Sequence, residues 1–170
     1  LTPILTWLIV HIHPSSSIYR KRWLAAVFLV LITHPLLDCF TVYGTQIFWP
    51  FSEYPVTWST VFIIDPAYTL PLLVGSLCAC IMSRNGLHGR HLNAAGLIVS
   101  SAYLVFSIAG KWQADRAALF TAAQHHLSNT SFVTAAAPFN TLLWRVVFVD
   151  GHRYGEGFYS LFDQSDSIRL

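Results

Sequence analysis

Long runs of apolar residues dominate the first two thirds of the chain. Residues 23–40 are nearly unbroken, residues 61–82 form a second run interrupted by Asp65, and residues 92–110 form a third. An α-helix rises about 1.5 Å per residue, so runs of about 20 residues match a bilayer core about 30 Å thick. Residues 1–12 are apolar but too short to cross it. The pattern predicts about four membrane segments; buried core helices of a soluble protein are the alternative, which the lack of polar faces disfavours.

The pattern changes towards the C-terminus. Residues 142–149 are rich in β-branched and aromatic side chains, and the Asp150-Gly151 pair that follows favours a tight hairpin turn. Residues 154–162 alternate in part between aromatic and polar positions, and residues 132–135 are a candidate third strand. A lone hairpin is only marginally stable, so we expect this region to pack on the membrane domain or on the membrane surface.

The fold class predicted from these patterns is mainly α. We expect a polytopic transmembrane helical bundle over residues 1–126 and a small extramembrane β-hairpin region over residues 127–170. Composition agrees with a membrane protein, because 54% of residues are hydrophobic and 11% are charged, against about 25% charged residues in soluble domains. The formal net charge of +2 is too small to indicate nucleic-acid binding. Membrane lipids are therefore the expected partners, and nucleic acid is not.

Basic residues predict the topology. Residues 20–22 are all basic, Arg84 and Arg90 follow the third apolar segment, and residues 41–60 contain no lysine or arginine. Basic loops stay on the cytoplasmic side of a membrane. The pattern thus predicts a multi-pass protein in which residues 41–60 and the chain after Lys111 face outward, with a periplasmic or extracellular C-terminal region.

His34 and Asp38 are the clearest candidates for chemistry inside an apolar segment. They are four residues apart, so they share one face of a helix. Ionisable groups in a membrane helix are costly and normally face a cavity or a partner. A neutral imidazole and a carboxylate one turn apart can bind one divalent metal together. The alternative is a structural hydrogen bond between the two side chains.

Asp65 and Lys111 are expected at the same outward face. We consider Asp65 as a further ligand or base, and Lys111 as a group that meets an anionic headgroup. Each also has a simpler interpretation. Asp65 followed by Pro66 is typical of a helix start with an aspartate cap, and Lys111 can extend along the helix to the interface.

The loop between the second and third segments is unusually apolar for an exposed loop. Tyr43, Thr45 and Gln46 within it are candidate substrate-binding residues, because their side chains can form hydrogen bonds. Gly44 permits a tight turn among them. The alternative interpretation is a loop that simply packs against the ends of the helices.

Several of these runs together resemble one family, the bacterial membrane-bound metal-dependent hydrolases. The matching runs are Thr33-His34-Pro35-Leu36-Leu37-Asp38, Thr41-x-Tyr43-Gly44-Thr45, Trp49-Pro50-Phe51-Ser52, Ile64-Asp65-Pro66-x-Tyr68-Thr69-x-Pro71-Leu72 and Pro138-Phe139-Asn140-Thr141-Leu142-Leu143-Trp144-Arg145. The resemblance implies a protein of the bacterial inner membrane with a divalent metal site, zinc being the first candidate, that faces outward.

The chain departs from that family in one respect. Such proteins carry an Asp-x-Asp element and a His-Arg-x-x-Thr-His-Ser element earlier in the chain, and neither occurs in residues 1–170. His34 and Asp38 would then supply part of the site, and we expect the other ligands upstream of Leu1. On this interpretation the first helix is truncated, and the 170-residue chain holds metal weakly and is inactive as it stands.

Two functional hypotheses follow, and the sequence leaves open whether the chain is an enzyme. The first is a membrane-bound, metal-dependent hydrolase that acts on a lipid-linked or phosphate-bearing substrate at the interface. The second is a non-enzymatic membrane protein, such as a transporter subunit or assembly factor, in which the His/Asp cluster is a relay or structural element. Bound metal discriminates between them, because a relay needs none.

Overall fold

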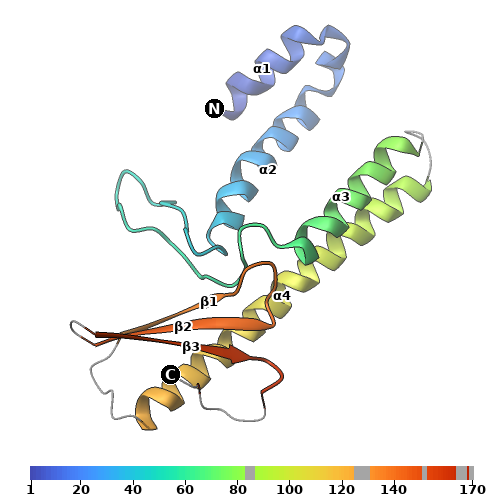
Figure 1. The fold of residues 1–170 in the computed structure, drawn as a ribbon. Helices are drawn as coiled ribbons and strands as arrows, with labels where there is room; N and C mark the ends of the chain where they lie inside the picture. Colours follow the sequence, from blue (N-terminus) through green and yellow to red (C-terminus); the bar gives the residue numbers. More distant parts are fainter. Residues whose placement is uncertain (83–86, 125–130, 151–152, 164–167, 169–170) are drawn as a thin grey trace. The chain divides into compact units, whose positions relative to one another are not determined.

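The computed structural model describes residues 1–82, 87–124, 131–150, 153–163 and 168. The chain forms two compact units, Leu1–Thr57 and Trp58–Leu170. The helices and strands (Figure 1) are, in chain order, α1 (Thr2–Ile12), the short 3-10 helix η1 (Pro14–Tyr19), α2 (Arg20–Asp38), α3 (Pro66–Ile81), α4 (Leu87–Gln124), β1 (Ser131–Ala136), β2 (Leu143–Asp150) and β3 (Arg153–Ser160).

The first unit is a pair of helices followed by a long loop. A proline in its first turn favours the start of α1 at Thr2. The backbone N–H groups of a first turn have no acceptor within the helix, so the missing N–H of proline costs nothing there. Thr6 is buried, and its hydroxyl donates to the carbonyl of Thr2 at 2.9 Å. Apolar side chains of α1 and α2 face one another across a shallow groove that Leu8, Trp23 and others line.

The loop after α2 is held by backbone pairing rather than by a core. Thr45 and Val56 form an isolated antiparallel bridge with N–H to carbonyl distances of 3.1 and 3.0 Å. Gly44 precedes this bridge with φ +65°, and a Cβ there would lie 2.5 Å from the carbonyl oxygen of Val56. The Thr57 hydroxyl donates to the carbonyl of Thr41 at 2.7 Å. The bridge fixes the base of the loop, whose tip carries the exposed rings of Phe48, Trp49, Phe51 and Tyr54.

In the second unit, α3 and α4 lie side by side and antiparallel (Figure 1). Small residues allow the close approach. A Cβ built at Gly75 would lie 3.0 Å from the carbonyl oxygen of Leu92, and one built at Gly96 would overlap the carbonyl oxygen of Pro71. One turn further along α4, the Ser100 hydroxyl donates to the carbonyl of Tyr68 at 2.8 Å. The apolar side chains of both helices point mainly outward and are exposed.

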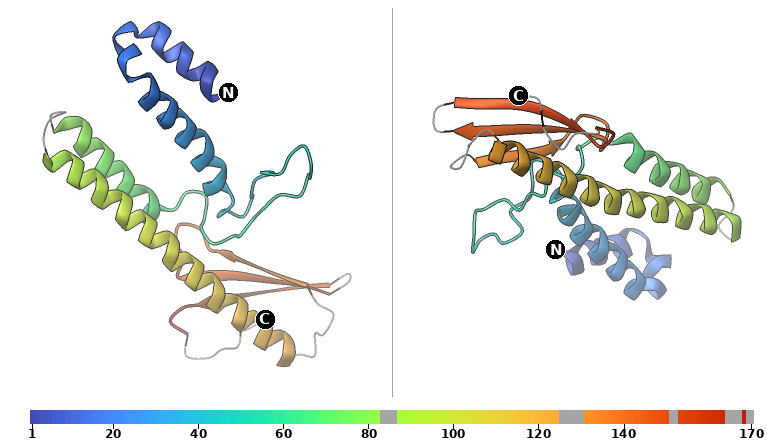
Figure 2. Two further views of the ribbon diagram at one scale, coloured as in Figure 1. Left: turned by 180° about the vertical axis from the view of Figure 1, so that it is seen from behind. Right: turned by 90° about the horizontal axis from the view of Figure 1, so that it is seen from below.

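The C-terminal part of α4 supports the antiparallel sheet, whose strand order is β1-β2-β3. Both views of Figure 2 show the sheet alongside this part of the helix. The helix presents small buried residues, and the sheet presents Trp144, Val146 and Phe148 from alternate positions of β2. The buried small residues of this part of α4 are Gly110, Ala114, Ala117, Ala118 and Thr121. This cluster, joined by Tyr159 and Ile168, is the main core of the second unit.

The outer face of the sheet carries an ion pair. Arg145 donates to Glu156 through two nitrogens, at 2.7 and 3.0 Å. This two-point contact raises the pKa of Arg145 and lowers the pKa of Glu156, because each charge stabilises the other. Trp144 on the same strand lies on the opposite, buried face. Neighbouring residues of β2 therefore lie on opposite faces of the sheet, as the period of two of a β-strand requires.

The predicted polytopic transmembrane helical bundle is wrong. Among the described residues, α4 alone is long and apolar enough to cross a membrane. The helices α1 and α3 have 11 and 16 residues, which is short for a span. The helix α2 has 19 residues, but they include three basic residues in its first turn and Asp38 at its end.

The error has a local cause. The apolar run 61–82 was counted as one segment, but residues 61–65 are irregular chain, and α3 begins only at Pro66. Hydropathy measures composition and does not register the helix start that Asp65 and Pro66 impose. In the C-terminal region, the two predicted hairpin strands and the candidate third strand are confirmed as β2, β3 and β1. Gly151, the second residue of the predicted turn, lies outside the described residues.

Candidate functional site

His34 and Asp38 lie side by side on the last two turns of α2. The imidazole Nε2 is 3.7 Å from the carboxylate Oδ2, and the side chains are 80% and 44% exposed. Within the described residues, neither side chain has another hydrogen-bond or ion-pair partner. Thr41 binds the backbone carbonyl of Asp38 at 2.8 Å and leaves its carboxylate available. An imidazole nitrogen and a carboxylate oxygen are suitable donors for a divalent metal.

An apolar pocket of about 540 Å³ lies in the first unit on a neighbouring face of α2, and His34 and Asp38 are not among its lining residues. Its walls come from α2 and from the loop, and they include two of the predicted substrate-binding residues, Thr45 and Gln46. Leu31 and Pro35 line the pocket as well. Leu31 is three residues before His34, and Pro35 is three residues before Asp38, so each is a neighbour of that residue on the helix surface. The remaining lining residues are Thr2, Phe28, Ile32, Leu36 and Ile47.

The three predicted substrate-binding residues of the loop differ in their hydrogen bonds and exposure. The amide of Gln46 donates to the carbonyl of Glu53 at 2.7 Å, so it helps to shape the loop. Among the described residues, the hydroxyl of Thr45 has no hydrogen-bond partner. The ring of Tyr43 is 76% exposed and is not among the residues that line the pocket. Thr45 is thus a polar group of the pocket that remains available for a ligand.

Asp65 is buried at the start of α3, and both of its carboxylate oxygens accept hydrogen bonds. Oδ1 accepts the backbone N–H of Ala67 at 2.9 Å, which is the predicted helix cap. Oδ2 accepts the hydroxyl of Tyr103 from α4 at 2.7 Å. The Tyr103 hydroxyl in turn accepts the hydroxyl of Thr141 at 3.0 Å. This chain ties α3, α4 and the β1–β2 connection together.

Lys111 lies where α4 begins to support the sheet. Its ammonium is 2.9 Å from Oδ1 of Asp115, one helical turn later, and 3.0 Å from the carbonyl oxygen of Thr134 in β1. The hydroxyl of Thr134 contacts both the ammonium of Lys111 and the carboxylate of Asp115. The lysine therefore links helix and sheet in this structure.

The predicted site residues fall in two different units of the chain. His34 and Asp38 belong to the first unit, and Asp65 and Lys111 belong to the second, where each has its own partners. The predicted shared site stays a prediction. Sequence reasoning missed Tyr103 and Asp115, although Asp115 could have been found from its spacing of four after Lys111. Among the described residues, no group of three or more histidine, cysteine or acidic side chains gathers as a metal site.

Comparison with known proteins places the chain in a family of inner membrane proteins. Searches among curated proteins and among solved structures give no significant match. Residues 1–114, out of 170, match the family described as YdjM inner membrane protein. The match covers α1, η1, α2, α3 and the part of α4 up to Ala114, and it leaves the sheet outside.

Proposed function

The chain belongs to this family of inner membrane proteins. We propose that it is a membrane-bound, metal-dependent hydrolase for phosphate-bearing or lipid-linked substrates. One observation carries the proposal. His34 and Asp38 place two metal-binding donors 3.7 Å apart, with no competing partner in the described residues, on the helix that also forms a wall of an apolar pocket. The outward orientation of this site across the membrane is part of the proposal and follows the distribution of basic residues.

The chemistry of the donors fits a divalent ion such as zinc. When bound, such an ion supplies a Lewis acid that polarises a phosphoryl or acyl oxygen. Catalytic zinc sites commonly use three protein ligands, and His34 and Asp38 supply two. The proposal needs a third donor in addition to this pair, since the described residues of the first unit bring no third histidine, cysteine or acidic side chain to it.

The pocket beside the pair suits the apolar part of a lipid-linked substrate. Its volume of about 540 Å³ falls in the range of small-molecule pockets. Side chains such as Phe28, Leu31 and Ile32 supply an apolar wall. Thr45 offers a hydroxyl at the loop side, where it can bind the polar end of the substrate. Tyr43 and Gln46 complete the proposed substrate-binding residues.

In this proposal, Asp65 and Lys111 do not take part in the reaction. Their observed partners support positioning roles, because Asp65 caps α3 and binds Tyr103, and Lys111 binds Asp115 and β1. The proposed reaction therefore relies on His34 and Asp38 and on the pocket beside them.

A second candidate function rests on the partly buried chain of hydrogen bonds from Thr141 through Tyr103 to Asp65. Three linked hydroxyl and carboxylate groups, at 3.0 and 2.7 Å, are the elements of a proton relay in a non-enzymatic membrane protein. This alternative requires no metal at His34 and Asp38. Hydrolysis and its metal dependence therefore separate the two functions.

The hydrolase proposal predicts metal-dependent turnover of an interfacial ester. The protein expressed from its natural gene and purified in detergent is tested with phosphatidic acid in mixed micelles and with p-nitrophenyl octanoate. We expect hydrolysis of at least one probe with zinc or manganese, loss with a chelator, and a loss of about 100-fold in His34→Ala and Asp38→Ala, since removal of a ligand costs about 2.7 kcal/mol or more.

The matched control is His91→Ala, which removes a histidine from α4 in the second unit. This variant should keep the activity of the unchanged protein. If neither probe is hydrolysed with any metal, or if His91→Ala and His34→Ala lose activity equally, the hydrolase proposal fails and the relay becomes the better account.

A further inference from the structure

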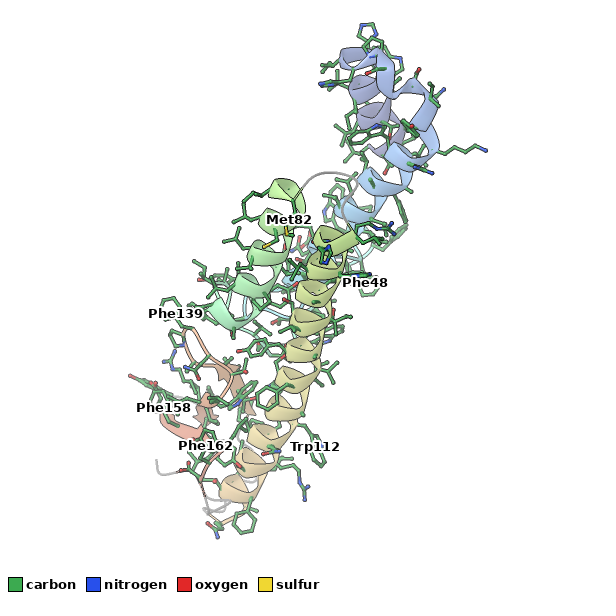
Figure 3. The ribbon with its side chains drawn as sticks, turned by 90° about the vertical axis from the view of Figure 1, so that its right-hand side faces the viewer. Phe48, Met82, Trp112, Phe139, Phe158 and Phe162 are labelled. Atoms are coloured by element: carbon green, nitrogen blue, oxygen red, sulfur yellow. The ribbon has the colours of Figure 1, made fainter. Side chains whose placement is uncertain are left out.

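A second pocket, of about 400 Å³, lies between α4 and the sheet in the second unit. Arg116 and Gln113 line it with polar groups, and Tyr159 closes it from β3. Trp112 and Phe120 add exposed aromatic rings at its edges, and Ala117 leaves room at its floor. Figure 3 shows Trp112 projecting outward from α4. The pocket shares no residue with the proposed hydrolase site.

The position of the pocket along α4 corresponds to the headgroup layer. Residues 91–110 of this helix contain no lysine, arginine, aspartate or glutamate. Twenty helical residues span about 30 Å, the thickness of the hydrocarbon core. Arg116 follows Gly110 by six residues, which places its Cα about 9 Å further along the helix axis. Trp112 lies between them, at the depth where tryptophan is enriched in membrane proteins.

The side chains of the pocket suit a phosphate group. The guanidinium of Arg116 stacks over the ring of Trp112 at 4.8 Å from its centroid, which leaves the N–H groups at its edge free to donate. Within the described residues, no carboxylate lies in salt-bridge range of Arg116, whereas Lys111 is neutralised by Asp115. A planar guanidinium binds phosphate through two parallel hydrogen bonds.

We propose that the pocket around Arg116 binds the headgroup of one anionic phospholipid, with its phosphate on the guanidinium and its glycerol region against Trp112 and Phe120. An anchored lipid there would hold the sheet and the end of α4 at the membrane surface. Soluble phosphate shares the same chemistry but lacks the apolar part that the aromatic rings would cover. The proposal is independent of His34 and Asp38.

Lipid retention in native mass spectrometry tests this proposal. The protein is released from nanodiscs that contain phosphatidylglycerol and phosphatidylcholine, and the lipids kept by each variant are counted and titrated. We expect the unchanged protein to retain one phosphatidylglycerol in preference to phosphatidylcholine. The affinity for phosphatidylglycerol should fall about tenfold in Arg116→Gln. Arg116→Lys should give an intermediate loss, because lysine keeps the charge without the planar fork. Glycerol phosphate and inorganic phosphate, each in excess, should compete poorly.

Arg145→Gln is the matched control, since it removes an exposed arginine from the outer face of the sheet in the same unit. It should retain phosphatidylglycerol like the unchanged protein, and circular dichroism should show all variants folded. Equal retention by Arg116→Gln and the unchanged protein would overturn the proposal. Full retention by Arg116→Lys, or complete competition by inorganic phosphate, would also overturn it, because either result removes the need for a shaped lipid pocket.

Discussion

Replacement of Trp144 by alanine is expected to destabilise the second unit by about 3–5 kcal/mol, the usual cost of removing a fully buried tryptophan. The ring is 0% exposed and lies at the centre of the cluster between α4 and the sheet. Its indole N–H donates to the carbonyl of Thr141 at 3.0 Å. A Cβ at Gly110 would lie 3.0 Å from the same ring, so the helix already approaches as closely as a glycine allows. On the helix side, Gly110 has no side chain that could fill the cavity left by alanine.

Urea denaturation in detergent, followed by near-ultraviolet circular dichroism, measures this loss of stability. Leu143→Ala is the control, because Leu143 is the preceding residue of β2 and is 37% exposed on the other face. Leu143→Ala should lower the free energy of unfolding by about 1 kcal/mol, because a partly exposed leucine buries less apolar area than Trp144 does. Equal losses for the two variants would mean that Trp144 is not at the centre of the core.

Replacement of Gly96 by alanine is expected to destabilise the pairing of α3 and α4 by about 2–3 kcal/mol. The new Cβ would overlap the backbone oxygen of Pro71, and a backbone atom cannot move aside as a flexible side chain can. Alanine favours a helix by about 1 kcal/mol over glycine, which offsets part of the cost. Thermal unfolding in detergent, together with protease sensitivity of the α3 region, measures the effect.

Gly89→Ala provides the same chemical change on the same helix with more room. Its nearest neighbour, the carbonyl oxygen of Met82, would lie 3.2 Å from the new Cβ. The tight contact and the gain in helix propensity should nearly cancel, which gives a change close to zero. A larger loss of stability for Gly89→Ala than for Gly96→Ala would contradict the packing described for α3 and α4.

Local chemistry made parts of the fold predictable from the sequence. Asp65 and Pro66 predicted a helix start, and the structure has the aspartate cap there. The β-branched and aromatic residues around Trp144 predicted a strand, and three strands are confirmed. Both signals are short-range, because a cap or a strand face depends on neighbours within a few residues.

Long-range features were not predictable in the same way. Counting apolar residues in the run 61–82 cannot show that residues 61–65 stay irregular, and this led to the wrong expectation of a polytopic bundle. The partner of Asp65 is Tyr103, 38 positions later, and nothing in the spacing of these two residues selects it. The small residues Gly75 and Gly96 could be read as a helix contact only after the antiparallel pairing was known.

Metal content is the measurement that tests the proposed function most directly. The protein expressed from its natural gene is equilibrated with zinc, passed through a desalting column and analysed by elemental mass spectrometry, beside His34→Ala, Asp38→Ala and the control His91→Ala. The account predicts about one zinc per chain in the unchanged protein and in His91→Ala. It predicts almost none in His34→Ala and Asp38→Ala, because each variant loses one of the two donors that lie 3.7 Å apart on α2. Equal zinc content in all four proteins, or no zinc in any of them, would contradict a metal site at this pair.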